Sequence, residues 1–121
     1  MECEWGKFSD FPKMWLLENG RDMMLATDFS YTDRAGKVWS VPCGAKVNGA
    51  NIPQALWTLV GGPWDGLHRY ASILHDWYCA KRTEPWLNVQ LMFYEACRCA
   101  GMGEFKANLL YFAVKMCAKW E

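Results

Sequence analysis

The side chains best suited to acid–base chemistry lie in one short run, His75-Asp76-Trp77-Tyr78. Imidazole exchanges protons near neutral pH, so His75 is the candidate general base. If the run is helical, as the periodicity below predicts, neighbouring side chains point about 100° apart and Asp76 does not face His75. Asp76 is then better placed to bind a cation or an adjacent loop. The alternative is a structural role, in which both residues tie the helix to a loop by hydrogen bonds.

A stripe on the same helix is a candidate metal face. His68, His75 and Cys79 follow one another at i, i+7 and i+11, on one side of the helix. Metal ligands on adjacent turns normally lie three or four residues apart, and the wider gaps in this stripe span two turns. We therefore expect no resident metal at this stripe.

The loop from Pro42 to Pro53 is the second candidate site. Its residues Asn48, Gly49 and Asn51 suit tight backbone geometry, and Asn51 can cap a helix that starts near Pro53. The loop lacks the Gly-Lys-Ser/Thr ending of a phosphate-binding loop. Its polar residues are therefore candidates for partner contacts rather than for phosphate binding.

Tryptophans gather around this loop and the helix starts, among them Trp57, Trp64 and Trp77. A small domain needs large apolar side chains in its core, so most tryptophans should be buried. One or two are expected to form an exposed contact patch. Together with Asn48, Gly49 and Asn51, the three tryptophans Trp57, Trp64 and Trp77 are the predicted binding residues.

Strands are predicted for the first part of the chain. Residues 1–46 are short apolar runs broken by Gly, Asp and Pro. Residues 23–26 and 38–41 flank residues 33–36, an arrangement that predicts a β-hairpin with its turn at 33–36. Residues 14–17 are a candidate further strand.

Helices are predicted from Pro53 onward, where the apolar period changes. A first turn is followed by longer helices over about residues 67–81, 86–100 and 104–120, separated by Gly and Pro. The apolar stripe of the last helix, Phe105, Leu109, Phe112, Ala113 and Met116, is expected to be buried. The prediction is one α+β domain over residues 1–121. Residues 1–46 form a small antiparallel sheet with loops, and residues 47–121 are mainly helical, with three main helices.

Composition excludes several classes of protein. The chain has 121 residues, of which 52% are apolar, too many for a disordered chain. Its 13 basic and 13 acidic residues balance, which argues against a nucleic-acid partner because phosphate binding needs a basic surface. The longest uncharged stretch, residues 47–64, contains Asn, Gly and Pro and cannot span a membrane.

The cysteines and the N-terminus indicate the compartment. Residues 1–5 carry two acids and no apolar run follows, so no signal peptide is expected. Of the six cysteines, Cys79, Cys97, Cys99 and Cys117 occupy core-like helical positions. We therefore expect buried, reduced thiols in a protein of the bacterial host cytoplasm or of a virion.

Two motifs carry a family resemblance. The loop Gly49-Ala50-Asn51-Ile52-Pro53 and the later His75-Asp76-Trp77 element resemble the phage- and prophage-associated family catalogued as domain of unknown function 1353, over roughly residues 22–115. The family usually has an Asp before the loop glycine and another in its later helix. This chain has the amides Asn48 and Gln90 at those positions.

The family pattern is in turn distantly similar to phospholipase A2. That similarity implies His75 as general base, Asp76 as a calcium ligand and Gln90 at the position of the residue that orients the histidine. A glutamine could hold His75 by a hydrogen bond, but it could not stabilise an imidazolium as a carboxylate does. The similarity is one of pattern, from which function does not follow.

Two functions remain open from the sequence. The first is a small phage-type accessory protein that binds a protein partner, either a virion component or a host target, and carries a degenerate His-Asp site. The lost acids, the zero net charge and the surplus of tryptophan favour it. The alternative is a calcium-assisted hydrolase with His75 as base and Asp76 on the metal. On balance we expect a binding protein rather than an enzyme.

Overall fold

The computed structural model describes residues 2–19, 22–47, 56–60 and 67–115. Seven short strands come first and helices follow, so the predicted α+β class is confirmed. The strands are β1 (Glu2–Cys3), β2 (Gly6–Phe8), β3 (Met14–Leu16), β4 (Met23–Leu25), β5 (Phe29–Asp33), β6 (Val38–Val41) and β7 (Lys46–Val47). The helices are α1 (Trp57–Val60), α2 (Arg69–Lys81), α3 (Trp86–Cys99) and α4 (Glu104–Val114).

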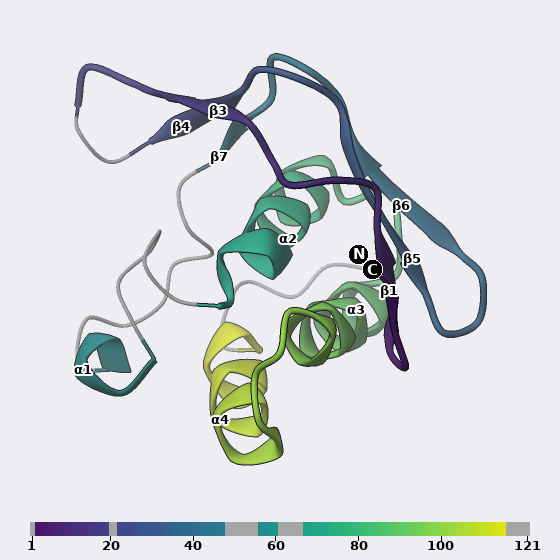
Figure 1. Ribbon diagram of the computed structural model, residues 1–121. Coiled ribbons are helices and arrows are strands. Elements are labelled where there is room, and N and C mark those ends of the chain that lie inside the picture. The colour runs from purple at the N-terminus through teal and green to yellow at the C-terminus, as the bar shows by residue number, and fades with distance from the viewer. Residues whose placement is uncertain (1, 20–21, 48–55, 61–66, 116–121) are drawn as a thin grey trace.

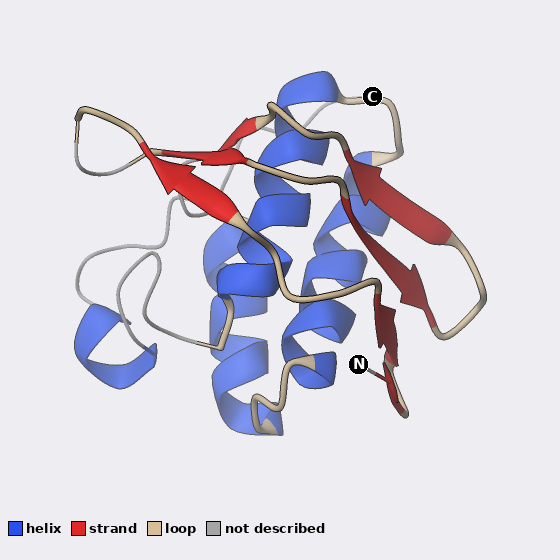
Figure 2. Ribbon diagram, turned by 45° about the horizontal axis from the view of Figure 1, so that its top comes forward, coloured by secondary structure: helices blue, strands red, loops and turns tan. Residues whose placement is uncertain are grey.

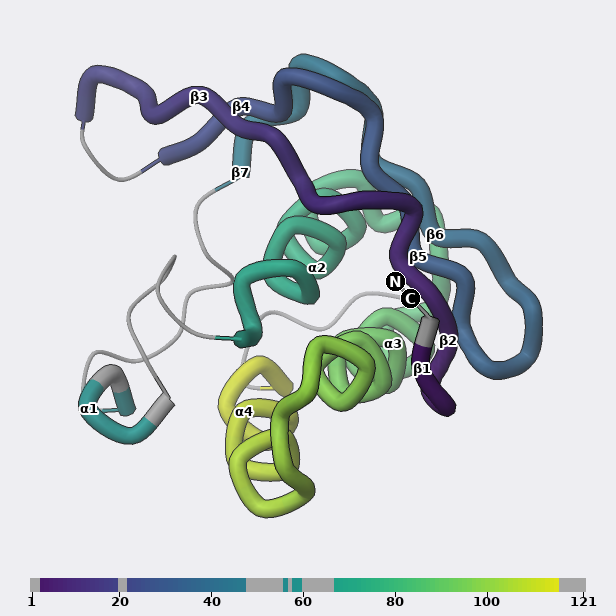
Figure 3. Tube along the Cα trace, viewed as in Figure 1, coloured from purple at the N-terminus to yellow at the C-terminus, as the bar shows by residue number. Residues whose placement is uncertain are grey.

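The strands form two antiparallel sheets rather than one. The first sheet has the order β1-β2-β5-β6, and the second has the order β3-β4-β7. Figure 3 shows the chain leaving β2 and running past α2 to reach β3, the first strand of the second sheet. Ring contacts hold this connection, because Phe8 and Phe11 lie 5.3 and 6.3 Å from Tyr70 of α2, between ring centroids.

The hairpin turn was predicted correctly, but one of its strands was not. The turn at residues 33–36 joins β5 to β6, whereas the predicted strand at residues 23–26 is β4 and belongs to the second sheet. Buried residues of β5 alternate with partly buried ones, and those of β6 alternate with exposed ones. The buried Phe29 pairs with Val41, and the buried Tyr31 pairs with Trp39. This alternation gives the hairpin one apolar face, which covers the helices.

Both sheets lie on the same side of the helices (Figures 1 and 2). α2 packs against β6, β7 and α3, while α3 packs against β2, β5 and α4. Buried side chains from both sheets and from the three long helices form one core cluster. α2 and α3 are therefore the central layer, and any residue on their shared side is removed from solvent.

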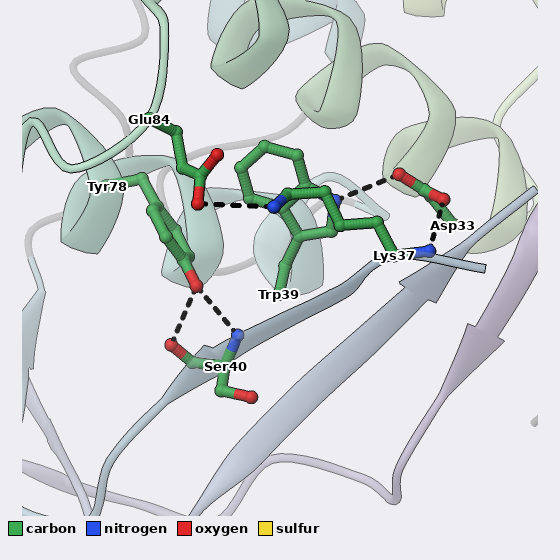
Figure 4. A network of polar contacts seen from close by, with 6 residues as sticks. All are labelled: Asp33, Lys37, Trp39, Ser40, Tyr78 and Glu84. Carbon is green, nitrogen blue, oxygen red and sulfur yellow. Dashed lines mark hydrogen bonds and ion pairs between the residues drawn. The ribbon is translucent and has the colours of Figure 1, made fainter. Parts of the chain in front are cut away.

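Polar contacts stabilise the β5–β6 hairpin and also connect it to α2 and to the segment between α2 and α3 (Figure 4). The Asp33 carboxylate accepts hydrogen bonds from the Lys37 backbone N–H and from Trp39 Nε1, each at 3.0 Å. The Tyr78 hydroxyl of α2 meets the backbone N–H and carbonyl of Ser40 at 2.9 and 3.3 Å. Lys37 also pairs with Glu84, at 3.2 Å between Nζ and Oε2.

The predicted burial of the last helix was wrong in its orientation. Phe105 and Phe112 are 73% and 62% exposed, whereas Ala107, Leu110 and Val114 are buried. Small and medium side chains thus face α3, and the two aromatic rings face outward. The residues beyond Lys115, including the predicted core position Met116, lie outside the described part of the chain.

The prediction of buried, reduced thiols holds in full for Cys97, whereas Cys79 is free but only partly buried and Cys43 is free and exposed. It fails for Cys99 and Cys3, and Cys117 lies outside the described residues. Cys3 and Cys99 form a disulfide across 96 residues, which joins β1 to the last residue of α3. Cys43, Cys79 and Cys97 are free thiols. Core-like spacing identified Cys97 as buried, but it could not show that the N-terminal strand lies beside the end of α3.

Candidate functional site

α2 carries a row of buried polar side chains on the side that faces the core. His68 and Ser72 are fully buried, and His75 is 2% exposed. The residues recur at intervals of three and four, which is the spacing of one helix face. The helix thus places the predicted base, His75, in the interior between α2 and α3 rather than at the surface.

Gln90 of α3 faces His75 directly. The distance between His75 Nε2 and Gln90 Oε1 is 2.8 Å, and the ring of Phe93 lies 5.0 Å from the imidazole in an edge-to-face arrangement. Because a carbonyl oxygen can only accept, the imidazole donates through Nε2–H. The pairing expected from the family resemblance, in which the later helix supplies a group that holds the histidine, is present.

Burial keeps this imidazole neutral. Removal from solvent lowers the pKa of His75 from 6.5 to about 4, although the hydrogen bond with Gln90 acts in the opposite direction. Desolvation penalises the charged ring, and an amide cannot compensate as a carboxylate would. At neutral pH His75 is therefore an uncharged hydrogen-bond donor packed among aromatic and aliphatic groups.

The same interior has polar atoms without partners. Gln90 Nε2 and Ser72 Oγ are buried and make no hydrogen bond within the described residues. Each such atom carries a desolvation penalty of about 1–3 kcal/mol. These buried polar side chains distinguish the α2–α3 interface from the rest of the described core, which consists of apolar side chains.

The remaining residues of the predicted stripe do not assemble a metal centre. Cys79 Sγ lies 3.7 Å from His75 Nδ1 and 3.5 Å from Nε2. A sulfur nearly equidistant from both nitrogens does not lie along the lone pair of either one. Within the part of the chain that the structure describes, no group of three or more His, Cys, Asp or Glu side chains could hold a metal ion.

Asp76 and Trp77 lie at the edge of this interior. Both are partly exposed, and Lys81 Nζ stands 4.7 Å from the centroid of the Trp77 ring. Asp76 is thus less buried than His75, its neighbour on the helix. Its predicted role as a calcium ligand remains a prediction, because residues 48–53, half of the loop that would supply carbonyls, are not among the described residues.

The other predicted binding residues fall outside the described residues. Asn48, Gly49, Asn51 and Trp64 lie in undescribed segments, and of Trp57 only the backbone, at the start of α1, is described. Of the predicted contact surface, the structure therefore places Trp77 alone.

Sequence reasoning missed the exposed aromatic side of α4. Phe105, Phe112 and the neighbouring Leu67 are 73%, 62% and 46% exposed. Leu67 and Phe105 also line an open hollow of about 430 Å³, together with Met102 and Lys106. The helical stripe was visible in the sequence, but a stripe alone does not tell a core face from a contact face.

The fold and the His75–Gln90 pair define an α+β domain with a helix-borne histidine held by the following antiparallel helix. The chain belongs to the family described as protein of unknown function (DUF1353), whose model matches residues 23–114. The match starts at β4 and ends with α4, so it includes His75, Gln90 and both phenylalanines of α4. β1, β2 and β3 precede it.

Two relatives come from Sinorhizobium fredii (strain NBRC 101917 / NGR234). The uncharacterized protein y4jT is 39% identical over 90 residues, which cover 74% of this chain and 27% of that protein. The uncharacterized protein y4iH is 36% identical over 91 residues, which cover 75% of this chain and 38% of that protein. The chain thus matches well under half the length of either relative. No solved structure matches it.

Proposed function

We propose that this domain binds a protein partner through the exposed side of α4. The α4 face, as we name it, consists of Phe105 and Phe112 with the adjacent Leu67. The observation that carries the proposal is the exposure of the two phenylalanines on a helix whose opposite side is buried. Large aromatic side chains that cluster at the surface of a small domain are typical of interaction sites.

The energetic gain from covering this face is substantial for so small a domain. Complete burial of a phenylalanine contributes about 1.5–3 kcal/mol, so rings with 73% and 62% exposure retain about 1–2 kcal/mol each. A partner that buried both rings and Leu67 would gain several kcal/mol to offset the entropy lost on association. The α4 face therefore offers two of the aromatic side chains in which the cores of protein interfaces are enriched.

The buried histidine supports a binding role over catalysis. His75 is 2% exposed and neutral, and Gln90 stands where the family pattern has a carboxylate. A substrate would have to displace core side chains to reach the ring. We infer that the His75–Gln90 pair serves the structure of the α2–α3 interface, and that the partner is a virion component or a bacterial host protein.

The test is a capture experiment with matched variants. The wild-type chain, the double variant Phe105→Ser/Phe112→Ser and the control Leu91→Ser are immobilised and exposed to host lysate and to phage particles. Leu91 is 43% exposed on α3, where it lines a different hollow with Lys37 and Trp39. We expect a protein that wild type and Leu91→Ser retain and the double variant loses, followed by direct binding of that protein in purified form. Equal capture by all three would contradict the proposal.

The calcium-assisted hydrolase is the alternative function, and one observation favours it. Gln90 holds His75 at 2.8 Å, which is the arrangement that a positioned base requires. If this alternative were right, calcium would raise the melting temperature, and Asp76→Asn would abolish that increase. Hydrolysis of a phospholipid or ester substrate should then disappear in His75→Gln. No calcium-dependent stabilisation and no turnover would exclude it.

A further inference from the structure

We propose that the partner segment is acidic, and that a row of cations resting on aromatic rings receives its carboxylates. This inference rests on the proposed function and names the chemistry of the partner. The cation–aromatic row, as we define it, consists of Arg34, Trp5, Arg98, Tyr94, Tyr111 and Lys115, in that spatial order. It runs from the β5–β6 turn to the end of α4.

The contacts within the row are continuous. The guanidinium carbons of Arg34 and Arg98 lie 4.4 and 5.0 Å from the centroid of Trp5. Arg98 Nη1 donates to the Tyr94 hydroxyl at 3.1 Å, and the Tyr94 ring meets that of Tyr111 at 6.0 Å between centroids. Cations and rings thus succeed one another without a gap.

The row joins the α4 face at its far end. Lys115 Nζ lies 4.8 Å from the centroid of Tyr111 and 5.7 Å from that of Phe112. Phe112 therefore belongs to the α4 face and also contacts the last cation of the row. A partner that covers the α4 face with apolar side chains would bring its flanking residues onto these cations.

Two cations of the row, Arg98 and Lys115, are available for carboxylates, whereas Arg34 already lies beside Glu95. Within the part of the chain that the structure describes, the ion pairs join Lys13 to Asp10 and Lys37 to Glu84, and none involves Arg98 or Lys115. A guanidinium stacked on a ring keeps its N–H edges for bidentate bonds to a carboxylate. Stacking also fixes the side chain in advance, which lowers the entropy lost on binding.

The composition of the row fits a protein rather than a nucleic acid. Tryptophan, tyrosine and arginine are the residues most enriched in protein hot spots. The rings are engaged with cations and with each other, so few faces remain for stacking with bases. The chain has zero net charge, and a continuous phosphate backbone along the row would pass Asp33 and Glu95 beside Arg34. A short peptide can confine its carboxylates to Arg98 and Lys115.

The disulfide places Trp5 in this row. Cys3 lies two residues before Trp5, and its partner Cys99 directly follows Arg98. The cross-link therefore pins the N-terminal turn beside the end of α3, where Trp5 meets both arginines. β1 and β2 lie outside the matched family region, so the row combines residues of the family domain with a residue from outside it.

The experiment measures fluorescence anisotropy of labelled peptides with the intact, oxidised chain. The probe is a 16-residue peptide in which pairs of glutamates alternate with pairs of phenylalanines. In its matched control, every glutamate is replaced by glutamine. A single-stranded DNA oligonucleotide is the third probe. The variants are Arg98→Gln, which removes the central cation, and Arg69→Gln. Arg69 also rests on a ring, 4.9 Å from the centroid of Tyr70, but lies outside the row.

We expect the glutamate peptide to bind at least about 10-fold more tightly than the glutamine peptide, with an affinity that falls as salt rises. Arg98→Gln should weaken binding about 10-fold or more, whereas Arg69→Gln should change it less than about 2-fold. Melting temperatures near wild type show that both variants fold.

Three results would overturn the inference: equal binding of both peptides, no effect of Arg98→Gln, or tighter binding of the DNA. The inference and the proposed function fail separately. If the capture experiment succeeds through Phe105 and Phe112 while the glutamate peptide shows no preference, the α4 face binds a partner of different chemistry. If the glutamate peptide binds as expected and the capture experiment shows no difference between wild type and the double variant, the cation–aromatic row binds acidic segments independently of the α4 face.

Discussion

Acidification should destabilise the folded protein through His75. The folded-state pKa of this imidazole is about 4, below its ordinary value of 6.5, because the ring is buried. Between these two values the unfolded chain binds a proton at His75 and the folded chain does not. The free energy of unfolding therefore falls as the pH drops below about 6.5, and this contribution levels off below about 4.

The magnitude follows from the width of that window. Each pH unit between 6.5 and about 4 changes the free energy of unfolding by about 1.4 kcal/mol, which gives about 3 kcal/mol in total. A domain of this size has about 5–15 kcal/mol of stability, so the effect is a large fraction of it. Because His75 is almost completely buried, solvent screening reduces this free energy only slightly.

The assay compares wild type with His75→Gln by urea denaturation at several pH values between 7 and 4. The carboxylates and the other histidine, His68, are present in both proteins, so their titration cancels in the difference. Glutamine keeps a polar group near Gln90 but does not titrate. The stability of wild type relative to the variant should fall by about 3 kcal/mol from pH 7 to pH 4.

Parallel stability curves for the two proteins would refute the reasoning, because they would show that His75 does not titrate differently on folding. If His75→Gln does not fold, the ring protons of wild type give the same information by NMR. The chain has two histidines, so the assignment is simple. A His75 resonance that titrates near 6.5 in the folded protein would be equally decisive against a buried, neutral ring.

Three further predictions concern the scaffold. Reduction of the Cys3–Cys99 disulfide, which closes a loop of 96 residues, should lower the free energy of unfolding by about 4–5 kcal/mol in denaturant titrations with and without reductant. An unchanged midpoint would mean that the bond does not form. Gly6→Ala should cost about 2 kcal/mol or more, because a Cβ at φ +130° would lie 2.1 Å from a carbonyl oxygen, while the control Gly103→Ala has open space and should be close to neutral in thermal melts. Tyr78→Phe removes the hydroxyl that bonds β6 and should lower the melting temperature by a few degrees, about 1 kcal/mol; no change would show that water replaces it without cost.

Local pattern predicted much of the helical half. The helices expected at about residues 67–81 and 86–100 are observed as Arg69–Lys81 and Trp86–Cys99. Leu74, Val89 and Phe93 of these two helices are fully buried. Helical periodicity and Gly or Pro punctuation act over a few residues, so the sequence carries them directly.

In the β half, the local sequence pattern predicted strands but not how they pair. Residues 23–26 were recognised as a strand, but their partners are β3 and β7 rather than β6. Pairing depends on residues far apart in the chain, and a short strand offers too few side chains to specify its neighbour. The second sheet was not predicted for this reason.

The sequence by itself determined the fold class, the position of His75 on a helix, its expected partner position Gln90, and the membership of the family. Only the tertiary structure decided that His75 is buried and neutral, that Phe105 and Phe112 face solvent, and that Cys99 meets Cys3. A helix presents the same stripe to a core or to a partner, and burial sets the pKa of an imidazole. Both depend on which elements pack against that helix, which is a property of the assembled chain.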